Sequence, residues 1–161
     1  MNRQTWLLMT GPQKTAFLRE WAIAHSTDPL VRQTAVLLVN RAGRDDHLER
    51  LRRLHAFVRD SVPYHRESVE MFQHPSLTLR QGGDCDDHAA LLFALAWSLR
   101  YPFHLQAIGH PEGPAHYTGF LGWPPGESPY GDAGTRWLPA ETTIDALFGE
   151  GLRRAQERLF A

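Results

Sequence analysis

The stretch that decides the fold reads Gly82-Gly83-Asp84-Cys85-Asp86-Asp87-His88-Ala89-Ala90-Leu91-Leu92, and it contains the only cysteine of the chain. A pair of glycines and an aspartate, a residue favoured at helix N-caps, precede the cysteine, and an apolar run follows it. This order predicts that Cys85 lies in the first turn of a helix. Asp84 is then the N-cap, and Asp87 completes a variant of the capping box. Backbone N–H groups and the helix dipole favour an anion there, so the position suits a reactive thiolate.

The aspartates around the cysteine act against the thiolate, because nearby negative charge raises the pKa of a thiol. Ionisation then requires a cation close by. His116 is the candidate, because it begins an alternating segment that predicts a rigid strand. His88, one helical turn beyond Cys85, is the main competitor, and His110 is a further histidine that would have to be excluded.

An acid that could orient the histidine follows a short segment late in the chain. Glu141 comes directly after Trp137-Leu138-Pro139-Ala140, and its carboxylate could accept a hydrogen bond from His116 and fix the tautomer of the ring. Asp145 is the alternative orienter. Cysteine, histidine and carboxylate in this order can form a nucleophile, a base and an orienter of the base.

The acidic cluster beside the cysteine can also be read as a metal site. Its members would be Asp84, Asp86, Asp87 and His88. Their spacing is neither that of a calcium loop nor that of a zinc site. We therefore expect no metal and no cofactor.

Composition limits the class of protein. A chain of 161 residues, of which 42% are hydrophobic and 22% charged, is most simply one domain with a core of its own. The formal net charge is -1 and no dense basic tract occurs, so we expect no nucleic-acid partner. There is no apolar run of about 18 residues and no secretory signal pattern, so no membrane is expected. A single cysteine cannot form an internal disulfide, which fits a reducing, cytoplasmic compartment.

The apolar pattern changes period along the chain. Helical spacing predicts four helices before the strands, at residues 13–26, 30–42, 44–62 and 89–99, the last apolar on most faces. Residues 63–83 are predicted to be a long connection. Alternation predicts three strands, at residues 103–108, 116–123 and 135–138, and a short amphipathic helix follows at 151–160. Helices first and strands later favour the α+β class.

Three segments together resemble the transglutaminase-like superfamily, a papain-related group of cysteine enzymes with bacterial and phage-associated members. Residues 77–89 resemble the family's Gly-Asp-Cys-Asp-Asp nucleophile segment, His116 opens a strand, and residues 137–143 read Trp-Leu-Pro-Ala-Glu-Thr-Thr. Residues 54–64 also resemble the family's helix before the active-site loop. The resemblance covers about residues 45–145.

The resemblance implies a papain/transglutaminase-like core, in which the cysteine helix packs on a small antiparallel sheet that bears the base and the acid. We expect a single domain over 1–161. Its parts are a helical part to about 62, an active-site loop and helix at about 63–100, a sheet part at about 101–145 and a C-terminal helix at about 150–160. Two residues depart from the family pattern: Glu141 replaces the usual aspartate, and Tyr117 follows the histidine where a small or β-branched residue is common, which would narrow the cleft.

The expected activity is acyl transfer on an amide or peptide carbonyl, with Cys85 as nucleophile, His116 as base and Glu141 as orienter. Hydrolysis of a protein or peptide is preferred, because water is always available. Transfer to an amine, as in a cross-linking transglutaminase, is one alternative. A non-catalytic module that binds a peptide or protein is another. The sequence does not predict the oligomeric state.

The oxyanion of this reaction needs two donors. The backbone N–H of Cys85 at the helix start is one of them. The second would be the side chain of Gln81 or of Tyr64, between which the sequence does not choose, and Asp84 would support the site as the helix cap.

Overall fold

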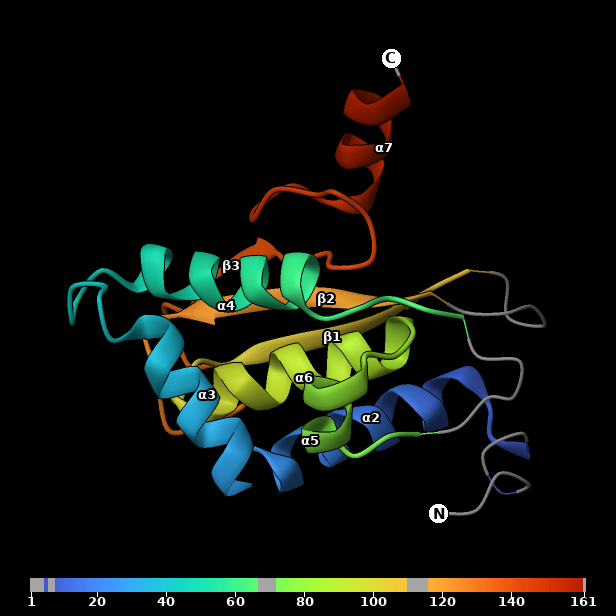
Figure 1. Cartoon of the computed structure of the whole chain (residues 1–161), viewed down its shortest axis with the longest axis horizontal. Helices are drawn as coiled ribbons and strands as arrows, with labels where there is room; N and C mark the ends of the chain where they lie inside the picture. The colour runs from blue at the N-terminus through green and yellow to red at the C-terminus, as the bar shows by residue number, and fades with distance from the viewer. Residues whose placement is uncertain (1–4, 6–7, 67–71, 110–115, 161) are drawn as a thin grey trace.

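The computed structural model describes residues 5, 8–66, 72–109 and 116–160 (Figure 1). The helices before the sheet are α2 (Gly11–His25), α3 (Pro29–Val39), α4 (His47–Ser61), α5 (Pro75–Gln81) and α6 (Cys85–Ser98). The sheet and the last helix are β1 (Phe103–Ile108), β2 (His116–Trp123), β3 (Arg136–Pro139) and α7 (Leu152–Phe160). This order confirms the α+β class, with a small antiparallel sheet after the helices.

The three strands form one sheet in the order β1-β2-β3, and both pairs are antiparallel. The register pairs Ile108 with His116 at one end of the β1–β2 ladder and Phe103 with Leu121 near the other. Phe120 is paired with Pro139 of β3. The first residue of β2 therefore lies at the end of the sheet, close to where β3 leads into the segment that carries Glu141.

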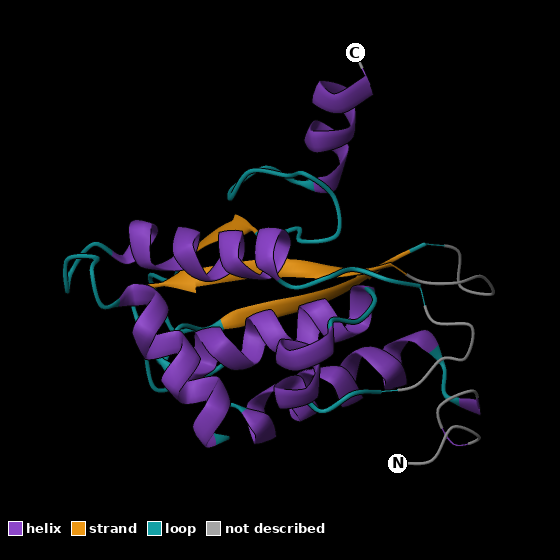
Figure 2. Cartoon of the chain, viewed as in Figure 1, coloured by secondary structure: helices purple, strands orange, loops and turns teal. Residues whose placement is uncertain are grey.

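Helix α6 is the centre of the molecule. It contacts β1 and β2, and α2, α3, α4 and α5 pack around it (Figure 2). All its residues from Asp86 to Ser98 are buried. Leucines such as Leu91 and Leu95 are fully buried, and each such side chain contributes about 1.5–3 kcal/mol through burial. This confirms the expectation of a central buried helix.

The close approach of α6 to the sheet depends on a glycine in β2. The ring of Phe93 stacks on that of Phe103, with the ring centroids 4.8 Å apart. A Cβ atom at Gly119 would lie 2.7 Å from Cζ of Phe93 and 2.1 Å from the backbone oxygen of His104. Any larger residue at this position would push the cysteine helix away from the sheet.

One helix boundary differs from the sequence prediction. The helix predicted at 30–42 begins one residue earlier, because Pro29 is the first residue of α3. Asp28 is the N-cap, and its carboxylate accepts hydrogen bonds from the N–H groups of Leu30 and Val31 at 2.9 and 3.2 Å. Proline is favoured at the first helical position because its missing N–H would have no partner there.

The connection at 63–83 contains more structure than the sequence indicates, because α5 occupies Pro75–Gln81. Its N-terminal part is paired with the stretch before α6: the N–H of Gly83 donates to the oxygen of Pro63 at 3.1 Å, and that of His65 to the oxygen of Gly83 at 3.0 Å. Gly82 has a φ of 81°, and a Cβ there would lie 2.2 Å from the oxygen of Pro63. The glycines therefore bring Tyr64 alongside the start of α6.

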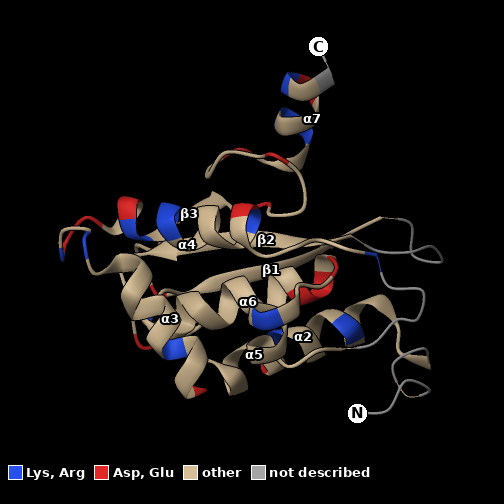
Figure 3. Ribbon diagram, viewed as in Figure 1, with Lys and Arg blue, Asp and Glu red and all other residues tan. Residues whose placement is uncertain are grey.

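The last helix, α7, extends away from the rest of the chain (Figure 1). Basic and acidic residues are interspersed along α4 (Figure 3), and ion pairs such as Arg53–Glu49 join them. Within the described ranges, none of the helices has the length and apolar character that crossing a bilayer needs.

Candidate active site

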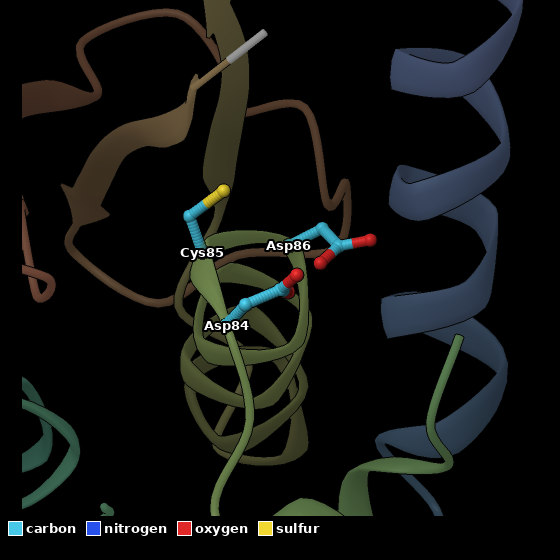
Figure 4. Close-up of side chains that lie close together, drawn as sticks. All are labelled: Asp84, Cys85 and Asp86. Carbon is cyan, nitrogen blue, oxygen red and sulfur yellow. The ribbon is translucent and has the colours of Figure 1, made fainter. Parts of the chain in front are cut away.

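Cys85 is the first residue of α6, as the sequence predicts, and Asp84 is the N-cap. The carboxylate of Asp87 accepts a hydrogen bond from the N–H of Asp84 at 3.4 Å, which is one half of a capping box. The thiol is free and partly buried. Figure 4 shows it directed toward the sheet, while the carboxyl groups of Asp84 and Asp86 lie together on another side of the first turn.

His116, at the start of β2, lies between the thiol and Glu141. Its Nε2 atom is 2.6 Å from Oε2 of Glu141. Hydrogen bonds to the side chain of Cys85 and to Glu141, the former having the larger effect, raise the pKa of His116 to about 10. At neutral pH the ring is therefore an imidazolium, the cation that the thiolate requires.

Glu141 follows β3 and is almost completely buried, with 1% of its surface exposed. Oε1 accepts hydrogen bonds from the N–H and the hydroxyl of Thr143, at 2.8 and 2.7 Å, while Oε2 bonds to His116. Burial alone would raise the pKa of Glu141, but the hydrogen bonds from His116 and Thr143 outweigh it and lower the pKa to about 2. The side chain of Glu141 thus reaches the histidine as an ionised carboxylate.

His55 of α4 holds the backbone of this acid, a contact that sequence reasoning missed. Its Nε2 lies 2.5 Å from the backbone oxygen of Glu141. Burial lowers the pKa of His55, so the ring is neutral, and because a carbonyl oxygen only accepts, Nε2 carries the proton. The available signal was a histidine in the apolar stripe of the helix predicted at 44–62.

The two candidate oxyanion donors lie in different surroundings. The side-chain amide of Gln81 donates to Oε1 of Gln73 and is thereby engaged away from the thiol. The ring of Tyr64 packs edge-on against that of His88, with the centroids 5.6 Å apart. Burial raises the pKa of the Tyr64 phenol, and the charge of Cys85 raises it further. Tyr64 is therefore the better placed of the two donors.

Gln73 is a buried residue of the connection that sequence reasoning did not single out. Its N–H and its side-chain amide donate to the two carboxylate oxygens of Asp87, at 3.0 and 2.7 Å, and the same amide donates to the oxygen of Gly82 at 3.1 Å. Trp21 of α2 donates in turn to the backbone oxygen of Gln73 at 3.1 Å. Gln73 thus fixes one aspartate of the cysteine segment and supports the glycine turn.

Asp86 changes the electrostatic balance around the thiol. Burial, reinforced by a hydrogen bond with Asp84 and by the neighbouring negative charges, raises the pKa of Asp86 far above its usual range. The side chain is therefore protonated at neutral pH and carries no charge. The three aspartates oppose the thiolate less strongly than the sequence suggests.

The remaining alternatives from the sequence are placed elsewhere. His88 is fully buried, and its Nε2 lies 3.3 Å from the backbone oxygen of Pro63. Its ring therefore bonds to the connection between α4 and α5. Asp145 forms no hydrogen bond to His116 in the part of the chain that the structure describes, and His110 lies outside the described residues. In the described ranges, the potential metal ligands that converge are Asp84, Cys85 and Asp86 alone, so the four-residue metal set is not assembled.

The site combines residues from three places in the chain: the start of α6, the start of β2 and the segment after β3. Tyr117, expected to narrow the cleft, is buried in the core. A scan against protein-family models and searches of the curated proteins and of the solved structures found no match for this chain.

Proposed function

We propose that this chain is a cysteine-dependent enzyme of the transglutaminase-like type that transfers acyl groups from an amide or peptide carbonyl. One observation carries the proposal: the His116 ring hydrogen-bonds to the Cys85 side chain and to the buried carboxylate of Glu141. A nucleophile, a base and an orienter in this relation are what covalent acyl transfer requires. The helix-on-sheet arrangement is compatible with a papain-related core.

In the first half of the reaction, the Cys85 thiolate attacks the carbonyl carbon and forms a C–S bond. The carbonyl oxygen becomes an oxyanion, which the backbone N–H of Cys85 and the Tyr64 hydroxyl stabilise. The His116 imidazolium then gives its proton to the leaving nitrogen, the C–N bond breaks and an amine departs. A thioester on Cys85 and a neutral His116 remain.

In the second half, neutral His116 takes a proton from water, and the hydroxide formed attacks the thioester carbon. The C–S bond breaks, a carboxylic acid is released and the Cys85 thiolate is restored beside the imidazolium. Throughout, Glu141 keeps its charge and stabilises the protonated ring. A primary amine that replaces water would give a new amide instead, which is the cross-linking alternative.

The intact set of thiol, imidazole and carboxylate favours an enzyme over a binding module that merely keeps the fold, because a module that only binds has no use for a nucleophile held beside a base. A reducing, cytoplasmic compartment would keep the thiol free. A protein or peptide substrate can approach the thiol because Cys85 is only partly buried.

The test uses internally quenched peptide pools of random sequence, with and without a fluorescent primary amine. We expect cleavage by the parent chain and none by Cys85→Ala. Incorporation of the amine at the expense of hydrolysis would identify the transferase alternative. Cleavage that survives in Cys85→Ala, or a parent that neither cleaves nor transfers while its thiol alkylates like a free cysteine, would overturn the proposal.

A further inference from the structure

A hollow beside the reaction centre, here called the side pocket, has a volume of about 470 Å³. Residues of the segments 59–64 and 142–145 line it. Ligand sites typically have volumes of about 300–1,000 Å³, so the side pocket has room for an amino-acid side chain with its solvent.

The side pocket adjoins the reaction centre through two of its lining residues. Tyr64 lines the pocket, and the charge of Cys85 affects its phenol. Thr143 also lines it and donates two hydrogen bonds to Glu141. A substrate whose carbonyl lies at Cys85 can therefore place a neighbouring side chain in the side pocket.

The lining combines an apolar part with charged groups. Val62, Pro63 and Ile144 provide the apolar surface. Such a surface suits the methylene chain of a long side chain whose polar end reaches water or a charged partner.

The two arginines that interact electrostatically with Asp145 are each hydrogen-bonded to another carboxylate. Arg59 donates to both carboxylate oxygens of Asp60, at 2.6 and 2.7 Å, and to the backbone oxygen of Ala146 at 2.7 Å. Arg158 donates to both carboxylate oxygens of Glu150, at 2.9 and 3.0 Å. Neither arginine therefore presents a free charge to an incoming substrate.

Asp145 is the acid of the side pocket whose carboxylate is free of hydrogen bonds within the described residues. Its carboxylate is exposed, lines the side pocket, and accepts no hydrogen bond and forms no ion pair within the described ranges. It does interact electrostatically with both Arg59 and Arg158. Both arginines hydrogen-bond to other carboxylates, and Arg158 also donates to the backbone oxygen of Asp145, but the carboxylate of Asp145 accepts no hydrogen bond from either of them. Figure 3 shows acidic segments both at the end of α4 and in the connection before α7.

We propose that the side pocket selects a long cationic side chain, lysine or arginine, next to the scissile amide of a peptide substrate, with Asp145 as its anionic partner. This inference rests on the proposed acyl transfer. The methylenes of the substrate side chain would lie on the apolar lining, and the cation would reach the carboxylate. Substrate specificity of this kind is a difference in binding between matched side chains, so it can be measured as a ratio.

The test compares internally quenched peptides that differ only in one residue beside the cleaved bond: lysine, norleucine or glutamate. Norleucine keeps the methylene chain and lacks the cation. We expect the parent chain to favour lysine over norleucine by about fivefold in kcat/KM, in the range of a single exposed ion pair, and to disfavour glutamate. The preference should shrink at high salt.

Variants locate the effect. Asp145→Asn should bring the lysine-to-norleucine ratio close to one, and Asp145→Lys should shift the preference toward glutamate. The matched control is Glu127→Gln, which removes a negative charge from an exposed loop. In that loop the N–H of Gly126 donates to the backbone oxygen of Arg100. Arg100 follows the C-terminal end of α6, whereas Cys85 is at its N-terminal end. This control should keep the parent ratio.

The outcomes separate the two proposals. Cleavage without a preference for lysine, or a preference that survives in Asp145→Asn, overturns the pocket assignment and leaves acyl transfer standing. If Asp145 were instead an orienter, its variants would slow all three peptides equally. If the parent cleaves none of them, anisotropy with fluorescent versions of the same peptides and Cys85→Ala still decides: tighter binding of the lysine peptide supports the pocket, and equal binding overturns it.

Discussion

Two buried acids near the thiol, Asp86 and Glu141, are exposed to only 6% and 1%, yet their charges differ. Burial acts against ionisation of both. Asp86 accepts one backbone N–H, from Asp87 at 3.1 Å, and otherwise faces Asp84, so its pKa rises. Glu141 takes part in three hydrogen bonds, one with the imidazolium of His116 and two from Thr143, so its pKa falls to about 2.

The difference shows that donors, more than burial, set the charge of an acid in this molecule. The result suits the proposed chemistry. The acid that must stabilise a cation is ionised, and the acid that would repel a thiolate is neutral. Single substitutions can test whether Glu141 is ionised and whether Asp86 is neutral.

The largest effect is expected from removing the shared cation. His116→Ala should slow alkylation of Cys85 by iodoacetamide about 10- to 100-fold at pH 6 and far less at pH 9, because an unassisted thiol with a pKa of about 8.5 ionises only at the higher pH. The matched control is His104→Ala, which removes an exposed histidine of β1 and should change little. Equal rates in His116→Ala and the parent at pH 6 would mean that no thiolate–imidazolium pair exists.

The same variant has a stability signature. The pKa of His116 is raised from 6.5 to about 10 in the folded chain. Its interactions therefore stabilise the fold fully below pH 6.5, and this stabilisation is lost as the pH rises toward 10. The difference in Tm between the parent and His116→Ala should narrow over that window in thermal scans.

The next largest effect concerns the acid itself. Glu141→Gln should keep the fold but lower kcat/KM about tenfold or more, because a neutral amide neither stabilises the imidazolium nor fixes its tautomer. Glu141→Asp should retain part of the activity, since it keeps a carboxylate that can accept from the imidazolium after a small shift of the backbone. Peptide cleavage with Cys85→Ala as the baseline gives the measurement. Full activity in Glu141→Gln would place the orienter elsewhere, with Asp145 the next residue to change.

Local signals in the sequence predicted much of this arrangement. The N-cap Asp84 and the apolar run located the start of α6, and strict alternation located β1 and β2. Helix α5 was missed because seven residues are too short to show a helical period. The glycines before Cys85 were placed in a long connection, and nothing in the sequence indicated the strand-like pairing of Gly83 with Tyr64.

Apart from the predicted contact of His116 with Glu141, long-range contacts were beyond the sequence. His55 and Glu141 are separated by 86 positions, and no local pattern relates them. Gln73 is one amide in a connection, and its role depends on where Asp87 is buried. The protonation of Asp86 follows from burial against α2 and from Asp84 (Figure 4), so the sequence presented three equal charges where the structure has unequal ones.

A smaller effect is expected at the residue that holds the acid's backbone. His55→Leu removes the donor to the Glu141 carbonyl and leaves that oxygen buried without it, which should cost about 1–3 kcal/mol in the free energy of unfolding measured with urea. It should also lower kcat more than it raises KM. His55→Gln retains an N–H donor and should recover part of both losses. If His55→Leu is destabilised but keeps the parent's kcat, His55 stabilises the fold and does not position Glu141 for catalysis.

The smallest effect is expected at Asp86, the neutral acid. The direction in which stability changes with pH distinguishes Asp86 from Glu141. Because the folded chain keeps Asp86 protonated while the unfolded chain ionises it above a pKa of 3.8, the parent loses stability as the pH rises above that value. Asp86→Asn has no proton to retain and can still accept from Asp87 and donate to Asp84. Relative to the parent, it should gain stability as the pH rises from 4 to 8, seen as a difference in Tm that widens over that window. Glu141→Gln should move the opposite way, losing stability relative to the parent as the pH rises through 2 toward 4.5, because the Glu141 carboxylate stabilises the fold only when ionised. A constant or shrinking gap for Asp86→Asn would mean that Asp86 is charged, and that the thiolate forms among three carboxylates with His116 alone to oppose them.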